Sequence, residues 1–157
     1  MKILVLGKDG QLGRAFKSLF DSLPSSQDRV IQYVGRNDCD LSNERTLVDL
    51  LNQFAPNLII NAAAYTAVDK AESDKEICYL VNETAVKNLA TACEKNGTLF
   101  FHISTDFIFD GKKSSPYNED DAPNPLGIYG ASKLAGEKTA LENCKQTILI
   151  RTAWVYS

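Results

Sequence analysis

A glycine-rich turn between the first apolar run and the first amphipathic stretch most narrows the folds open to this chain. The turn is Gly7-Lys8-Asp9-Gly10-Gln11-Leu12-Gly13, and it follows the aliphatic run at 3–6 directly. Glycines at this spacing permit a tight turn and a close backbone approach, while free N–H groups at the start of a helix attract a pyrophosphate. The alternative is a plain strand-to-helix turn without a ligand. The position of the glycine turn between a first strand and a first helix favours a phosphate-binding loop. We therefore expect Gly7, Gly10 and Gly13 to contact a dinucleotide.

The rest of the chain alternates short aliphatic runs with longer amphipathic stretches, the pattern of a parallel sheet covered by helices on both faces. Strands are expected near 2–6, 30–34, 58–61, 98–103 and 147–151, with a very short sixth strand near 39–41. Helices are expected near 11–22, 43–54, 75–95 and 126–142, with an N-cap at Ser42 and Asn43 and a stop at Gly97. The predicted fold class is α/β, a doubly wound parallel sheet of Rossmann type, in one domain that spans 1–157.

Composition and charge exclude several classes of function. The 157 residues are 44% hydrophobic and 24% charged, which suffices for one buried core. No apolar run is long enough for a signal peptide or a membrane span, so we expect a cytoplasmic protein without membrane partners. The formal net charge of −3, with dispersed lysines and arginines, argues against a nucleic-acid partner. The four cysteines have no close spacing, so we expect reduced packing residues and no metal site.

The residues after the second predicted strand bear on the type of dinucleotide. In the usual fingerprint an acidic residue there binds the adenosine ribose, whereas this chain has Gly35 and Arg36. A guanidinium suits a 2′-phosphate, which favours NADPH over NADH; a solvated arginine is the alternative, and NADH stays open. Asp40 and Leu41 are expected to flank the adenine, with the carboxylate accepting from its amino group and the leucine covering one face.

Tyr129 and Lys133 stand four residues apart and would share one face of the helix predicted at 126–142. A nearby ammonium favours the phenolate, so we expect Lys133 to lower the pKa of Tyr129 and to make it a better proton donor to a carbonyl that receives hydride. We also expect Lys133 to hold the nicotinamide ribose. An exposed helical pair is the alternative interpretation of this motif alone, and the polar strand ends described next favour the catalytic one.

Small and polar residues follow two predicted strands, at the edge where parallel sheets bind ligands. Ser104-Thr105-Asp106 follows the strand at 98–103, and we expect Thr105 to donate to the substrate carbonyl. Asn61-Ala62-Ala63-Ala64-Tyr65-Thr66 follows the strand at 58–61, and its small side chains let the backbone pass close to a flat cofactor.

Three further features receive no catalytic role. Asn82 is either a polar support for the site or an ordinary exposed helical asparagine. His102, the only histidine, lies mid-strand among phenylalanines and is expected in the core. The segment 110–125 interrupts the α/β pattern and is expected to be a surface loop that acts as a lid, while its acidic run Glu119-Asp120-Asp121 is expected to be solvated and metal-free.

Several strings together resemble the extended short-chain dehydrogenase/reductases: the glycine turn, Asn61-Ala62-Ala63-Ala64, Ser104-Thr105-Asp106, Tyr129-x-x-x-Lys133 and Arg151-Thr152-x-Trp154-x-Tyr156. Within that superfamily the chain is similar to the dTDP-4-dehydrorhamnose reductase family. The narrower resemblance comes from Ala67-Val68-Asp69-Lys70-Ala71-Glu72, Pro116-Tyr117-x-Glu119-Asp120-Asp121 and much of the run at 124–137. It covers the whole chain.

This resemblance implies reduction of the C4 keto group of dTDP-4-dehydro-L-rhamnose by NAD(P)H, giving dTDP-L-rhamnose for cell-surface polysaccharide synthesis. It implies Tyr129 as proton donor, Lys133 as its partner and ribose ligand, and Thr105 as donor to the carbonyl. Asp106 and Trp154 resemble positions that line the nucleotide-sugar pocket. The cofactor contacts that it implies are Gly10, Gln11, Leu12, Asp40, Leu41, Ala64, Tyr65 and Thr66.

Members of this family continue past the strand with Arg151 into a smaller domain that closes over the sugar nucleotide. We therefore expect this chain to lack the C-terminal substrate domain and to show little activity alone. The sequence leaves both a monomer and a homodimer as alternatives. Two other functions remain: a non-catalytic, nucleotide-binding regulatory subunit, and a sugar-nucleotide epimerase or dehydratase with tightly held NAD. Retention of the tyrosine, lysine and threonine argues against the first. A dehydratase would want an Asp-Glu pair, whereas Phe107 follows Asp106.

Overall fold

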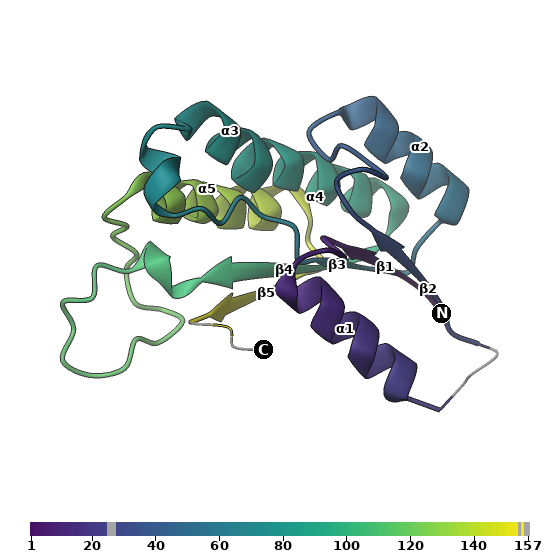
Figure 1. Ribbon diagram of the computed structural model, residues 1–157, viewed down its shortest axis with the longest axis horizontal. Helices are drawn as coiled ribbons and strands as arrows, with labels where there is room; N and C mark the ends of the chain where they lie inside the picture. The colour runs from purple at the N-terminus through teal and green to yellow at the C-terminus, as the bar shows by residue number, and fades with distance from the viewer. Residues whose placement is uncertain (25–27, 154, 156–157) are drawn as a thin grey trace.

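The computed structural model describes residues 1–24, 28–153 and 155. Its centre is a five-stranded parallel sheet in the order β2-β1-β3-β4-β5 (Figure 1). The strands are β1 Lys2–Leu6, β2 Val30–Val34, β3 Leu58–Asn61, β4 Leu99–Thr105 and β5 Thr147–Thr152. The chain moves outward from β1 in both directions, so a crevice opens at the carboxyl ends of β1 and β3, where such sheets bind ligands. The predicted α/β fold class and its five long strands are confirmed.

Helices cover the two faces of the sheet unequally. The main helices are α1 Gln11–Ser22, α2 Glu44–Phe54, α4 Ala85–Asn96 and α5 Ile128–Asn143; between α2 and α4 lie the 3₁₀-helix η1 Asp69–Glu72, the short α3 Lys75–Tyr79 and the π-helix η2 Leu80–Thr84. A further 3₁₀-helix, η3 Asp106–Ile108, follows β4. Right-handed crossovers place α1 on one face and α2, α4 and α5 on the other (Figure 1). Among the described residues, no helix has both the length and the apolar character to span a membrane.

The helix ends follow from local chemistry. The side chain of Asn43 accepts from the backbone N–H groups of Arg45 and Thr46 and so caps α2. Gly97 ends α4 in the left-handed conformation, with φ 63°. The predicted stop at Gly97 is confirmed, and of the two residues predicted to cap α2 only Asn43 does so, because the hydroxyl of Ser42 donates to Asp40.

The main core lies between the sheet and the helices α2, α4 and α5. Its fully buried side chains come from the inward face of the strands and from the helices: Leu4, Leu6, Ile59, Phe100, Leu47, Leu89 and Ala140. A smaller cluster on the opposite face joins Ile3, Val5 and Ile60 to Phe16 and Phe20 of α1. Burial of this apolar area supplies most of the free energy of folding and fixes the sheet edge that carries the site.

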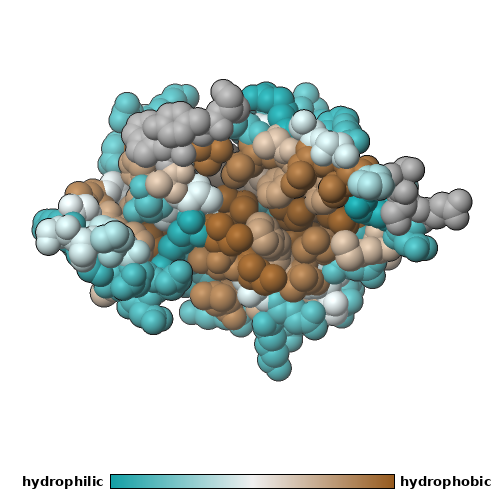
Figure 2. Space-filling view, turned by 90° about the horizontal axis from the view of Figure 1, so that it is seen from below, coloured by the Kyte–Doolittle hydropathy of each residue, from teal (hydrophilic) through white to brown (hydrophobic). Residues whose placement is uncertain are grey.

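One half of the sheet face on the α1 side is left uncovered. Phe101 belongs to the cluster under α1, and its partner in the register of β4 and β5 is Ile148. Ile148 and Ile150 are exposed to 44% and 38%. A broad apolar area lies at the centre of the molecule when this side is viewed (Figure 2). Within the described residues, α1 is the only helix on this face.

Two predicted elements differ from the structure. The sixth strand expected near 39–41 is wrong, because this segment forms a turn. The side chain of Asp40 accepts from the N–H and the hydroxyl of Ser42, and its carbonyl accepts from the hydroxyl of Thr46, so the segment is bonded locally and not to a strand. The helix expected at 75–95 is divided into α3, η2 and α4 by the π-helical turn.

Candidate active site

The glycine turn forms a cradle at the carboxyl end of β1. Gly7 has φ 83°, and a Cβ there would lie 2.7 Å from the backbone nitrogen of Ala63. A Cβ on Gly13 would collide with the carbonyl oxygen of Gly7. The first helix therefore starts close against β1, and no side chain caps its N-terminus at Gly10. Uncapped N–H groups above a glycine turn are the arrangement that binds a phosphate.

Two cavities open on either side of this helix start. The first, of about 310 Å³, is lined on one side by Gly7 and Gly10 and on the other by the segment after β2. Its remaining polar and apolar walls include Asp9, Gly35, Arg36, Asp40, Leu41, Ala63 and Ala64. The residues expected to flank an adenosine thus line one cavity with the glycine turn.

The second cavity, of about 420 Å³, brings the predicted catalytic residues together. Gly10, Gln11 and Leu12 form one wall. The other walls include Ala64, Thr66, Thr105, Asp106, Tyr129 and Lys133. The glycine turn, the end of β4 and the start of α5 thus meet at one edge of the sheet. Trp154, also predicted to line this site, lies outside the described residues.

Lys133 is buried beneath this cavity. Its side chain is almost fully inaccessible, and its Nζ donates to the carbonyl oxygen of Ile103 at 2.7 Å. Burial lowers the pKa of Lys133 to about 8, against the opposing effect of the carboxylate of Glu137. The ammonium is therefore anchored to β4, and Lys133 is one of the residues that line the cavity.

Tyr129 lies at the start of α5, with its ring edge-on to Phe107 at a centroid distance of 5.5 Å. Burial raises the pKa of Tyr129, the hydrogen bond with Thr105 opposes that rise, and the carboxylate of Asp106 adds to it. The expectation that Lys133 lowers this pKa is wrong for the chain as it stands, because the ammonium is bonded to Ile103 and is not among the groups that act on the phenol. The phenol is therefore protonated, but it is a weaker acid than the sequence predicted.

Thr105 holds the end of β4 in a defined turn. Its hydroxyl accepts from the backbone N–H of Phe107 at 3.2 Å and lies 3.2 Å from a carboxylate oxygen of Asp106. Thr105 is buried, and it lines the same cavity as Tyr129. The two side chains predicted to act on one carbonyl therefore lie along one cavity.

Asn82 is the support that connects the cofactor loop to the catalytic helix. It is buried in η2, and its side chain accepts from the N–H of Tyr65 at 2.9 Å and donates to the carbonyl of Tyr65 at 3.1 Å. The same amide donates to the hydroxyl of Ser132 at 3.0 Å, and that hydroxyl donates to the carbonyl of Tyr129. Of the two interpretations of Asn82, the structure favours the polar support.

His102 lies in the core as expected. Its ring is fully buried, and its Nδ1 lies 3.1 Å from the amide of Asn61, which also accepts from the N–H of Ala63. Burial holds the pKa of His102 well below its usual value, so the ring is neutral. This contact fixes the bend at the end of β3 and takes no part in the cavity.

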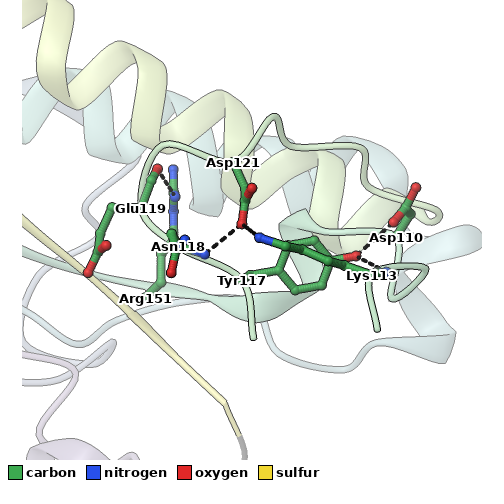
Figure 3. A network of polar contacts seen from close by, with 7 residues as sticks. All are labelled: Asp110, Lys113, Tyr117, Asn118, Glu119, Asp121 and Arg151. Atoms are coloured by element: carbon green, nitrogen blue, oxygen red, sulfur yellow. Dashed lines mark hydrogen bonds and ion pairs between the residues drawn. The ribbon is translucent and has the colours of Figure 1, made fainter. Parts of the chain in front are cut away.

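The segment 110–125 is closely bonded to itself (Figure 3). Asn124, Lys112 and Tyr117 donate to the carboxylate of Asp110, which lowers its pKa to about 2. Asp121 accepts from Lys113 and from the N–H of Asn118. This segment borders a further cavity of about 500 Å³ that shares Asp106, Phe107 and Tyr129 with the catalytic one. No group of residues suited to hold a metal ion occurs in the described part of the chain.

Arg151 joins this segment to β5 and α5. Its guanidinium makes hydrogen bonds to both carboxylate oxygens of Glu137, the closest at 2.8 Å, and to the carbonyl of Glu119 at 3.0 Å. It also lies over the ring of Phe109 at 5.4 Å. Reasoning from the sequence assigned this arginine no partner, because Glu137 and Glu119 are distant from it along the chain.

Comparisons with known proteins support the fold described above. The family model described as RmlD substrate binding domain matches residues 1–157. The chain is 39% identical to the dTDP-4-dehydrorhamnose reductase of Salmonella typhimurium over 158 residues, which cover 100% of this chain and 52% of that protein. The crystal structure of a dTDP-4-dehydrorhamnose reductase from Clostridium acetobutylicum matches with a TM-score of 0.94 at 36% identity, covering 99% of this chain and 54% of that one.

The corresponding reductase from Bacillus anthracis was solved in complex with NADP. It matches with a TM-score of 0.91 at 34% identity and covers 99% of this chain and 54% of that one. The chain therefore spans about half the length of the relatives that it matches.

Proposed function

We propose a function from one premise: this chain belongs to the RmlD substrate binding domain family, whose model matches it from end to end. The proposed role is the cofactor-binding and proton-donating half of a dTDP-4-dehydrorhamnose reductase. The reaction is reduction of the C4 keto group of dTDP-4-dehydro-L-rhamnose by NAD(P)H, which yields dTDP-L-rhamnose for polysaccharide synthesis. The observation that carries the proposal is the cavity lined jointly by Gly10, Thr105, Tyr129 and Lys133.

The residues present fit a dinucleotide. The cradle excludes a Cβ at Gly7 and at Gly13, and the N-terminus of α1 above it has no side-chain cap. A pyrophosphate at this helix start would meet unbonded N–H groups and the positive end of the helix dipole. The two cavities that flank the cradle provide one space for the adenosine and another for the nicotinamide side, where a bound cofactor supplies the hydride.

The chain's own residues supply the proton. Tyr129 donates its phenol proton to the oxygen of the keto group, and the hydroxyl of Thr105 donates a hydrogen bond to the same oxygen. Burial keeps this phenol protonated in the resting chain. Lys133 lines the same cavity and donates to the ribose hydroxyls from its anchored position.

The cofactor is NADPH in this proposal, with NADH as a weaker alternative. Arg36 lines the first cavity, is exposed and has no hydrogen bond within the described residues. Its guanidinium is therefore free to donate hydrogen bonds to a 2′-phosphate. The NADP complex of the Bacillus anthracis relative supports this choice.

Two measurements test the proposal. The 157-residue chain is titrated with NADPH, and binding is followed by nucleotide fluorescence. Residues 1–157 are then joined to the C-terminal half of the Salmonella typhimurium reductase, and the loss of NADPH absorbance is followed with dTDP-4-dehydro-L-rhamnose. We expect binding in the first and sugar-dependent oxidation of NADPH in the second.

The outcomes separate the three functions. Binding without turnover in the joined protein supports a regulatory, non-catalytic module. Release of a C4 epimer or a dehydrated sugar without net oxidation of NADPH supports an epimerase or a dehydratase. Failure of the chain to bind either dinucleotide contradicts all three.

A further inference from the structure

The helix α5, which carries Tyr129 and Lys133, has no capping side chain of its own. Its N-cap residue is Gly127, and its first turn contains no acidic residue. The N–H groups at the start of a helix have no partners within the helix and need an acceptor from elsewhere. An acceptor from another part of the chain, or water, must therefore complete the turn that carries Tyr129.

Glu72 supplies that acceptor from the 3₁₀-helix η1, which lies beside the start of α5 (Figure 1). Its Oε1 accepts from the backbone N–H of Ile128 at 2.8 Å, although the two residues are 56 positions apart in the sequence. A Cβ on Gly127 would lie 2.9 Å from the same oxygen, so glycine at this position leaves room for the carboxylate. A negative charge at a helix N-terminus also interacts favourably with the helix dipole. Glu72 is thus a cap that a distant element contributes to α5.

The short helix that carries Glu72 is itself anchored. Ala71 is fully buried, and its N–H donates to two carbonyls at the start of the segment, at 2.9 and 3.2 Å. Asp74, just after η1, accepts from the phenol of Tyr65 at 3.0 Å. Tyr65 belongs to the loop that follows β3. The segment Ala67–Glu72, which the sequence singles out without a role, therefore connects this loop to the start of α5.

A second contact holds the same turn of α5. A Cβ on Gly130 would collide with the carbonyl oxygen of Phe107, so the helix packs directly against the backbone of η3. Tyr129 stands between this contact and the capped N–H of Ile128. Glu72 and Tyr129 also line the same cavity of about 500 Å³. A shift of this turn would therefore move the phenol.

We propose that Glu72 is a positioning residue for the proton donor: by capping α5 from η1, it holds the first turn of the helix and with it the phenol of Tyr129. The inference rests on the proposed function, in which Tyr129 is the donor. Glu72 acts through the backbone of Ile128 and needs no contact with substrate or cofactor. Because a glutamine oxygen can accept the same hydrogen bond and an alanine cannot, the two replacements should differ.

Amide hydrogen exchange of the 157-residue chain, followed by NMR, tests the cap directly. In Glu72→Ala the N–H groups of Ile128 and Ala131 should exchange about fivefold faster, the scale of a lost N-cap, while Cys144 at the other end of α5 should be unchanged. Glu72→Gln should restore slow exchange. Glu76→Ala is the matched control, because Glu76 is an exposed glutamate on α3 whose side chain makes no hydrogen bond or ion pair within the described residues. It should change none of these rates.

Turnover of residues 1–157 joined to the C-terminal half of the Salmonella typhimurium reductase tests the link to Tyr129. Glu72→Ala should lower kcat for dTDP-4-dehydro-L-rhamnose about fivefold, because the phenol is correctly placed in fewer molecules, and should leave KM and NADPH affinity unchanged. Glu72→Gln should restore kcat. In a Tyr129→Phe background, Glu72→Ala should cause no further loss, since the group that it positions is gone.

The inference and the proposed function fail in different ways. Unchanged exchange at Ile128 in Glu72→Ala would overturn the inference, and so would a loss of kcat that persists in full in the Tyr129→Phe background. A higher KM with unchanged kcat would also overturn it, because the carboxylate would then bind the sugar nucleotide directly. A joined wild-type protein that binds NADPH without turnover would overturn the proposed function, and the exchange rates would then decide the cap by themselves.

Discussion

The buried amide of Asn82 offers the sharpest test of how the site is held together. Asn82→Ala removes its hydrogen bonds to the N–H of Tyr65, the carbonyl of Tyr65 and the hydroxyl of Ser132, at 2.9, 3.1 and 3.0 Å. A buried polar group that loses its partner costs roughly 1–3 kcal/mol. Tyr65 is only half-buried, so water can reach its backbone in part, and Ser132 keeps its bond to Tyr129. We therefore expect a loss of about 2–4 kcal/mol in the free energy of unfolding.

Urea denaturation of the 157-residue chain measures this loss, provided that the m-value is unchanged. Asn88→Ala is the control, because Asn88 lies on α4 and makes a single long bond of 3.5 Å to the carbonyl of Ser42. It should cost about 0.5 kcal/mol or less. NADPH affinity should fall with Asn82→Ala and not with Asn88→Ala, since only the former releases Tyr65 next to the cofactor contacts. Equal losses of stability in the two variants would refute the role assigned to Asn82.

Three further predictions address the cradle, the cofactor and the buried lysine. Gly13→Ala should destabilise the chain by roughly 1–3 kcal/mol through overpacking against Gly7, whereas Gly10→Ala, whose Cβ would lie 3.3 Å from the same carbonyl oxygen, should cost less; urea denaturation that ranks them the other way would contradict the cradle. Arg36→Ala should weaken NADPH about tenfold and NADH little in fluorescence titrations, and equal weakening would point to a disordered loop. The pKa of Lys133 falls from 10.5 to about 8 on folding, so the unfolded chain binds more protons between these values and stability rises with pH through this window. Lys133→Met should remove that rise, and a stability difference from wild type that is the same at pH 7 and pH 10.5 would show that folding does not lower the pKa of this lysine.

The sheet and its connections were predictable because they depend on local patterns. The alternation of short aliphatic runs and amphipathic stretches predicted all five strands, and the chemistry of Asn43 and Gly97 predicted a helix start and a helix end. The run Cys39–Leu41 misled the prediction because a short apolar-flanked segment does not reveal that Asp40 bonds to Ser42 and Thr46.

Other contacts of the site depend on how elements that are distant in the sequence pack together. The spacing of Tyr129 and Lys133 correctly predicts one cavity, but the direction of the lysine depends on the carbonyl of Ile103 in a neighbouring strand. The pairing of Lys8 with Asp38 likewise follows from the parallel register of β1 and β2, which no local pattern contains. The π-helical turn around Asn82 leaves no periodic signal in the sequence, so its clamp on Tyr65 emerges only from the packed structure.

The most direct test of the central claim is the turnover of Tyr129→Phe in residues 1–157 joined to the C-terminal half of the Salmonella typhimurium reductase. The phenol is the proton donor in this account, so turnover of dTDP-4-dehydro-L-rhamnose should fall by roughly 100-fold to 10,000-fold, the usual contribution of a positioned general acid. NADPH affinity should hardly change, because the pyrophosphate cradle at Gly7, Gly10 and Gly13 is untouched. A Tyr129→Phe protein with undiminished turnover would contradict the assignment of the acid, and with it the proposed reductase mechanism.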